Sequence, residues 1–73
     1  MAEIELRVRL IGGDRLDVTY AEPDTVEAEV ADHAISALAT DLGVLRSRHG
    51  DRLVVLYGRG VAAMEVAPRG AVL

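Results

Sequence analysis

The side chains in this sequence that are suited to metal binding are two histidines and their acidic neighbours. His33 follows Glu29 by four residues, a spacing that puts both side chains on one face of a helix. Two ligands do not complete a zinc site, which takes at least three protein side chains, so we interpret His33 as an exposed helix residue. His49 precedes Gly50, and we interpret it as a turn residue that tolerates unusual backbone angles. We therefore predict no metal site.

Nucleophilic catalysis also lacks its usual surroundings. Ser36 falls in a predicted helix and Ser47 in a predicted strand, and neither has the glycine-flanked context of a nucleophile elbow. Cysteine is absent, which removes thiol nucleophiles, disulfides and thiolate ligands together. Gly58-Arg59-Gly60 resembles part of a phosphate-binding loop, but no helix is predicted to follow it and bind the anion. We predict that the protein is not an enzyme and carries no cofactor.

Charge is divided unevenly along the chain. Residues 1–43 hold three Arg against ten Asp or Glu, for a net charge of −7, whereas residues 44–73 hold five Arg against two acids, for +3. The overall charge of −4 disfavours duplex nucleic acid as the main partner, because that affinity comes largely from neutralising phosphates. A local anion contact stays open through four residues of the second half, which are Arg46, Arg48, Arg52 and Arg59.

Length and composition predict one small domain over residues 1–73. A chain of this size buries only about 60% of its unfolded surface, so a partner surface would add to its stability. Hydrophobic residues make up 51% of the chain but include no Phe or Trp, so the core must be built mainly from aliphatic side chains. The N-terminal residues show no signal peptide, and no apolar run reaches the ~18 residues of a membrane span. We expect a cytoplasmic protein without membrane contact.

The elements that would position these side chains follow from the apolar periods. From Ile4 to Leu10 every second residue is aliphatic and the residues between are Glu or Arg, which predicts a strand over residues 3–11. Gly12-Gly13-Asp14 predicts a tight reversal, and the alternation resumes over residues 16–20. We expect a β-hairpin with one apolar face and one charged face that carries cross-strand ion pairs.

A helix is predicted over residues 25–42. Asp24 is expected to cap its N-terminus after Pro23, and Gly43 is expected to end it in the left-handed conformation. The predicted buried stripe repeats every three or four residues and consists of Val26, Val30, Ala34, Ile35, Leu38 and Leu42. Such a helix covers one face of a sheet.

The second half predicts another hairpin and a final strand. Gly50 marks the turn before an apolar run from Leu53 to Tyr57, and the last strand runs from Val61 to about Ala67. The order is ββαβββ if residues 44–48 form a strand and ββαββ if they do not. Either order is an α+β fold with one helix packed on one face of a mainly antiparallel, β-grasp-like sheet.

The final hairpin is apolar on both faces, and this is the feature that bears on function. If Arg52 faces water, Val54 and Leu56 share its face, and Val61 and Ala63 continue that face on the next strand. An uncovered apolar patch of this kind usually binds another protein or a second copy of the chain. In the alternative interpretation the strands are central and the extra apolar residues reflect β-propensity alone.

These features predict a non-enzymatic protein-interaction module with a scaffolding or regulatory role. It would self-associate or dock on a protein partner through its sheet. The alternative is a small binder of nucleic acid or of an anionic ligand that uses the four arginines named above.

Several segments of the second half share a pattern with one family of short proteins. These segments are Gly43-Val44-Leu45-Arg46, the turn at Gly50, Arg52-Leu53-Val54-Val55 and Val61-Ala62-Ala63-Met64-Glu65-Val66. The pattern resembles that of short actinobacterial proteins classed as a domain of unknown function, in which a helix precedes a glycine, a hairpin and a strand with an aliphatic-Glu-aliphatic ending. The resemblance implies a compact α+β fold and no particular activity.

The element order also resembles that of ubiquitin-like β-grasp proteins. The sequence departs from them at its C-terminus, because Arg69-Gly70-Ala71-Val72-Leu73 lacks the terminal Gly-Gly that conjugation uses. The resemblance therefore does not imply a conjugated modifier or a sulfur carrier.

Overall fold

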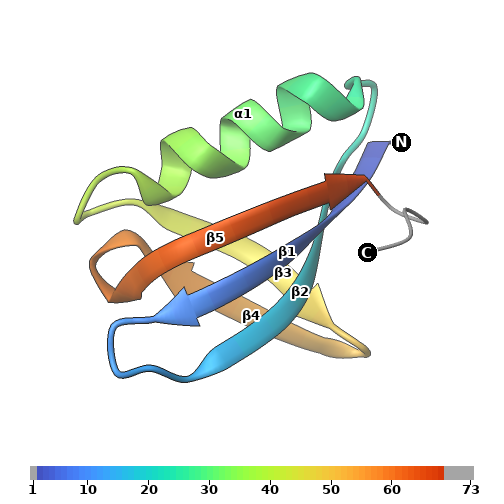
Figure 1. Ribbon diagram of the computed structural model, residues 1–73. Helices are drawn as coiled ribbons and strands as arrows, with labels where there is room; N and C mark the ends of the chain where they lie inside the picture. The colour runs from blue at the N-terminus through green and yellow to red at the C-terminus, as the bar shows by residue number, and fades with distance from the viewer. Residues whose placement is uncertain (1, 69–73) are drawn as a thin grey trace.

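The computed structural model describes residues 2–68, which form five strands and one helix in the order ββαβββ. The elements are β1 (Ala2–Leu10), β2 (Arg15–Glu22), α1 (Glu27–Leu38), β3 (Val44–His49), β4 (Arg52–Tyr57) and β5 (Val61–Pro68), with a 3-10 turn at Gly58–Gly60. The helix lies on one face of the sheet (Figure 1). The predicted α+β fold is confirmed, with residues 44–48 in a strand. The C-terminal residues 69–73, on which the comparison with ubiquitin-like proteins depends, lie outside the described residues.

The strands form one antiparallel sheet in the order β4-β3-β2-β1-β5, so β4 and β5 are its edge strands. The alternation in β1 buries its aliphatic residues on one side of the sheet, as predicted. Ile4, Leu6 and Val8 are at most 1% exposed and pack in the core with the buried helix residues, whereas Arg7 between them lies on the opposite side. We call the side covered by α1 the inner face and the opposite side the outer face.

The β1–β2 and β3–β4 hairpins are joined by a short stretch of pairing between β2 and β3. Strands β2 and β3 pair directly through Thr19 and Arg48, and the Nδ1–H of His49 donates to the carbonyl oxygen of Asp17 at 2.7 Å. The β3–β4 hairpin therefore turns away from β1 and β2, and Figure 1 shows its strands crossing behind β1. This twist lets a small sheet curl around a short helix.

The core consists of small aliphatic side chains, in keeping with the composition. Helix α1 contributes Val30 and Ala34, both 0% exposed, and the second hairpin contributes Leu45 and Leu56 at 3% and 4%. Burying a Val or Leu side chain fully stabilises a fold by about 1.5–3 kcal/mol, and burying an Ala contributes less. Stability is therefore spread over many modest contacts.

Helix α1 is shorter than predicted at both ends. It begins at Glu27 after Val26, which makes no side-chain capping bond, while Asp24 has a positive φ of 54° in the preceding turn and does not cap the helix. It ends at Leu38, so the prediction of a helix to residue 42 is wrong. No helix among residues 2–68 is long and apolar enough to cross a membrane.

The predicted buried stripe of the helix is wrong for three of its members. Val26, Ile35 and Leu42 are 62%, 50% and 87% exposed, because Val26 and Leu42 lie outside the helix and Ile35 lies on its solvent side. Gly43 does not have the predicted left-handed conformation either. It is required by a close approach, since a Cβ atom there would lie 1.6 Å from the carbonyl oxygen of Ala37.

Candidate functional site

An exposed apolar surface lies on the outer face of strand β4. Leu53, Val55 and Tyr57 are 58%, 37% and 47% exposed, and we call these three residues the β4 patch. Val44 on β3 lies opposite Tyr57 and extends the patch, with 47% of its surface exposed. Large aliphatic and aromatic side chains that stay in water along one strand are typical of a surface that binds another protein.

The exposed residues of β4 alternate with the residues of this strand that were predicted to face outward. Leu56 belongs to the core, and Val54 packs partly buried against it, so the prediction that these two residues face outward is wrong. Their facing partners on β3 set the orientation, because Leu45 and Ser47 are buried and the Ser47 hydroxyl donates to the Val54 carbonyl oxygen at 3.0 Å. The prediction used Arg52 to define the outer face, but Arg52 stands beside the turn, where a long side chain reaches water from either face.

The two residues predicted on β5 do not extend the surface either. Val61 pairs with Leu10 and packs partly buried against the core, whereas Ala63 pairs with Arg9 and is exposed. A register shift between Arg9 and Leu10 separates them, so alternation does not continue through this part of the strand. The four predicted interface residues therefore do not form one surface.

Within residues 2–68, the backbone of β4 also presents hydrogen-bonding groups that no neighbouring strand pairs with. The amide of Gly58 donates to the carbonyl oxygen of Gly43 at 2.9 Å, so even-numbered positions in this strand direct their backbone toward β3. By alternation, Leu53, Val55 and Tyr57 direct theirs toward the free edge. The β4 patch and the free backbone groups thus belong to the same three residues.

The four arginines proposed for anion contact do not gather at one place. Arg46 and Arg48 lie on the outer face of β3, opposite Val55 and Leu53, whereas Arg52 pairs with His49 at the turn on the alternate side of the strand. The guanidinium of Arg59 lies 5.2 Å from the centre of the Tyr57 ring. This is a cation–π contact that holds Arg59 at one end of the β4 patch.

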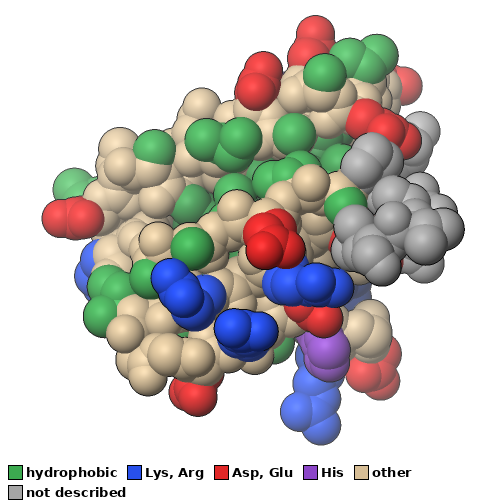
Figure 2. Space-filling view, in the orientation of Figure 1, with side chains coloured by type: hydrophobic (Ala, Val, Ile, Leu, Met, Phe, Trp, Pro, Cys, Tyr) green, Lys and Arg blue, Asp and Glu red, His purple; other side chains and the backbone are tan. Residues whose placement is uncertain are grey.

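The outer face of β1 is occupied by paired charges. Arg7 Nε lies 3.5 Å from Asp17 on β2, and its Nη1 lies 3.8 Å from Glu65 on β5. These residues line a hollow of about 290 Å³ on the outer face, together with Glu5 and Arg48. Figure 2 shows acidic and basic side chains intermixed on the visible part of the sheet. A surface with both signs of charge attracts an anion weakly.

A second apolar strip lies between the helix and β5. Figure 2 shows hydrophobic side chains along this junction, and the exposed residues on the two elements include Ile35 and Val66, at 50% and 37%. Met64 packs below them against the core. The short helix leaves this side of the core thinly covered.

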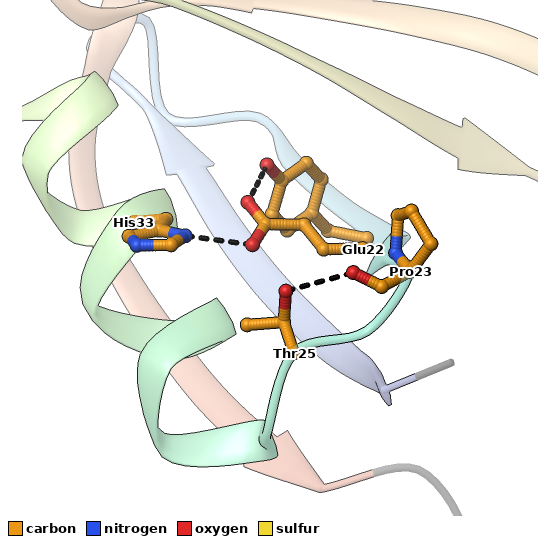
Figure 3. Close-up of polar contacts among 5 residues, drawn as sticks. Glu22, Pro23, Thr25 and His33 are labelled. Atoms are coloured by element: carbon orange, nitrogen blue, oxygen red, sulfur yellow. Dashed lines mark hydrogen bonds and ion pairs between the residues drawn. The ribbon is translucent and has the colours of Figure 1, made fainter.

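A polar cluster joins the end of β2 to the helix, and the sequence analysis did not anticipate it (Figure 3). The Tyr20 hydroxyl donates to Glu22 Oε2 at 2.5 Å, and His33 Nδ1 lies 2.6 Å from Glu22 Oε1. Because a carboxylate only accepts, the proton lies on Nδ1 of His33. The sequence spacing pointed to Glu29 as the neighbour of His33, but the residue that His33 contacts is Glu22, eleven residues away in the chain. A contact over this separation leaves no local sequence pattern.

The cluster shifts the pKa values of its two acids in opposite directions. The hydrogen bond from Tyr20, followed by that from His33, holds the pKa of the Glu22 carboxyl below its usual value. Burial raises the pKa of Tyr20 to about 12, with a further contribution from its bond to Glu22. Both shifts favour the carboxylate as an acceptor shared by the strand and the helix.

The chemistry available at these positions is limited. Among residues 2–68, no group of three or more His, Cys, Asp or Glu side chains is placed to hold a metal ion. Ser47 is buried and its hydroxyl is bonded to a carbonyl oxygen, so it is not available as a nucleophile. The Glu22–His33 pair joins strand β2 to helix α1, and the other hydrogen bond to Glu22 comes from the Tyr20 hydroxyl, which holds its proton with a raised pKa.

Comparisons with known proteins add no relative to this description. The chain matches no family model, no curated protein and no solved structure.

Proposed function

We propose that this domain is a non-enzymatic interaction module that binds an extended protein segment at the free edge of β4. The observation that supports this proposal is the coincidence of the β4 patch with the free backbone groups of the same residues. A strand added at this edge would receive main-chain hydrogen bonds and apolar side-chain contacts together. A scaffolding or regulatory role fits a module of this kind.

The composition of β4 supports its use as a binding edge. Natural edge strands usually carry proline, inward-pointing charge or a bulge, which prevent pairing with other chains. Strand β4 contains none of these between Leu53 and Tyr57, and its pairing with β3 is regular over all six residues. The other edge strand, β5, contains Glu65 and Pro68 and has the register shift described above. The edge of β5 is therefore better protected against pairing with another chain than the edge of β4.

A peptide-display selection tests the proposal. The immobilised domain is exposed to random short peptides, and the bound sequences are compared between the wild type and Val55→Pro. Proline removes one N–H from the free edge and is tolerated where that N–H faces water. We expect enriched peptides with alternating apolar residues, whose binding is lost in the variant.

A second substitution covers the case in which Val55→Pro perturbs the strand. Val55→Arg keeps the backbone donor but places a charge at the centre of the β4 patch, and it is expected to weaken the same peptides. Peptide binding that survives both substitutions would contradict the proposal. Selection of acidic peptides that depend on Arg46 and Arg48, and that are lost in salt, would support the anion-binding alternative instead.

A further inference from the structure

We infer that the segment bound at this edge is β4 of a second copy, paired antiparallel about a two-fold axis at Val55. This inference rests on the proposed function and names its partner. The two sheets would join through β4 into one continuous sheet, with a helix from each copy on the same side. Isologous contacts of this type are the commonest way in which identical subunits associate.

The alternation of β4 restricts how two copies can pair. Residues directly opposite each other in an antiparallel pair point to the same face, so outward residues must oppose outward residues. An axis at Val55 places Val55 opposite itself and Leu53 opposite Tyr57 of the second copy. Aliphatic–aromatic pairs of this kind stabilise sheets, and all three residues of the β4 patch gain an apolar neighbour. Their free N–H and C=O groups also meet in this arrangement.

Charge complementarity at the ends of the strand supports the same register. Asp51 in the turn before β4 and Arg59 in the 3-10 turn after it are each four residues from Val55, so an axis at Val55 brings Asp51 to the same end of the pair as Arg59 of the second copy. The symmetry repeats this approach at the other end. Asp51 and Arg59 are both exposed, and neither forms an ion pair within residues 2–68. The Tyr57 ring holds Arg59 beside the edge. Arg52 faces Gly58 of the second copy, so no like charges oppose each other.

Neighbouring registers lose this complementarity. An axis at Val54 sets Tyr57 opposite Asp51 and Arg59 opposite His49. An axis at Leu56 sets Arg59 opposite Leu53 and leaves Asp51 without a partner. Registers with the axis between two residues would oppose outward residues with buried ones. Among pairings of β4 with itself, the axis at Val55 alone matches apolar with apolar residues and opposite charges with each other.

A charge-exchange experiment tests both the dimer and its register. Sedimentation equilibrium of the wild type over a range of concentrations is expected to show a monomer–dimer equilibrium that dissociates on dilution, because a single short strand gives an interface at the small end of the usual range. Asp51→Arg and Arg59→Asp are each expected to weaken the dimer by about tenfold, because each homodimer then carries two like-charge contacts.

An equimolar mixture of these two variants provides the decisive comparison. The mixed dimer carries opposite charges at both ends, so association is expected to return to near the wild-type level. Asp32→Arg, which makes the same change of charge on the exposed side of α1, is expected to leave association unchanged. Absence of rescue in the mixture would overturn the register. A wild type that remains monomeric while its peptide binding is still lost in Val55→Pro would overturn self-pairing and leave the proposed function standing.

Discussion

The imidazole of His33 on helix α1 and the carboxylate of Glu22 on strand β2 are joined by a 2.6 Å contact from Nδ1 to Oε1. Glu22 accepts a second bond from Tyr20, two residues earlier on the same strand. The side chain of Glu22 is only 20% exposed, so its carboxylate is partly removed from water and depends on these donors. The contact therefore fixes the first half of the helix against the sheet.

The stability of the domain should fall with acid through Glu22. The pKa of this carboxyl is lower in the folded protein than its ordinary value of 4.5, so its stabilising effect is present above that pH and is lost as the pH falls through the folded pKa. Glu22→Gln should flatten this part of the pH dependence. Thermal unfolding followed between pH 7 and pH 3 measures it, and an unchanged acid limb in the variant would show that other carboxylates are responsible.

Alkaline pH should act through Tyr20. Its pKa is raised to about 12 in the folded state from an ordinary value of 10.0, so the folded protein holds the phenolic proton more tightly. The resulting stability is present below pH 10 and is lost as the pH rises from 10 toward 12. Absorbance titration near 295 nm should show a tyrosine that ionises close to pH 12 and that shifts downward in Glu22→Gln. Ionisation of Tyr20 near pH 10 would contradict the geometry of the cluster.

Two glycines should be intolerant of alanine for steric reasons, and a third offers a control. A Cβ atom at Gly58 would lie 1.9 Å from the carbonyl oxygen of Thr40, whereas one at Gly60 in the same turn meets nothing within 4 Å. We expect Gly58→Ala to destabilise the fold by about 3 kcal/mol or more. Gly43→Ala should behave like Gly58→Ala, and Gly60→Ala should change the free energy of unfolding by less than about 0.5 kcal/mol. Urea unfolding measures all three, and equal effects at Gly58 and Gly60 would be incompatible with the close approach.

Two leucines of β4 test which face of the strand is buried. Leu56 is 4% exposed and Leu53 is 58% exposed. Leu56→Ala should lower the free energy of unfolding by about 2–5 kcal/mol through loss of core packing. Leu53→Ala should change it by less than about 0.5 kcal/mol when measured at concentrations where the protein is monomeric. The reverse order of effects would restore the orientation that the sequence analysis predicted.

The sequence predicted the fold well where one face of an element is clearly apolar. The strict alternation from Ile4 to Leu10 identifies both the strand and its buried side, because charged residues occupy every other position. The order of the elements follows from the glycine turns and from the change of period between them. These signals are local, and local signals survive folding when the tertiary contacts agree with them.

The β4 surface could not be oriented in this way. Residues 53–57 are all apolar, so no polar–apolar alternation distinguishes the two faces of the strand. Arg52 at the turn indicated the wrong face as the exposed one. The orientation is set by β3, where Leu45 and Ser47 are buried, and the small Ser47 gave no apolar signal. The Glu22–His33 contact was missed for a related reason, because it depends on how the helix is placed on the sheet.

Amide hydrogen exchange on β4 measures whether the free edge of this strand pairs with another chain. In an isolated copy the amides of Leu53, Val55 and Tyr57 point to the free edge, so they should exchange quickly, while those of Val54 and Leu56 are protected by β3. When the protein concentration is raised, we expect the first three amides to become protected together and the edge of β5 to stay unchanged. Rapid exchange of Leu53, Val55 and Tyr57 at every concentration would contradict this expectation.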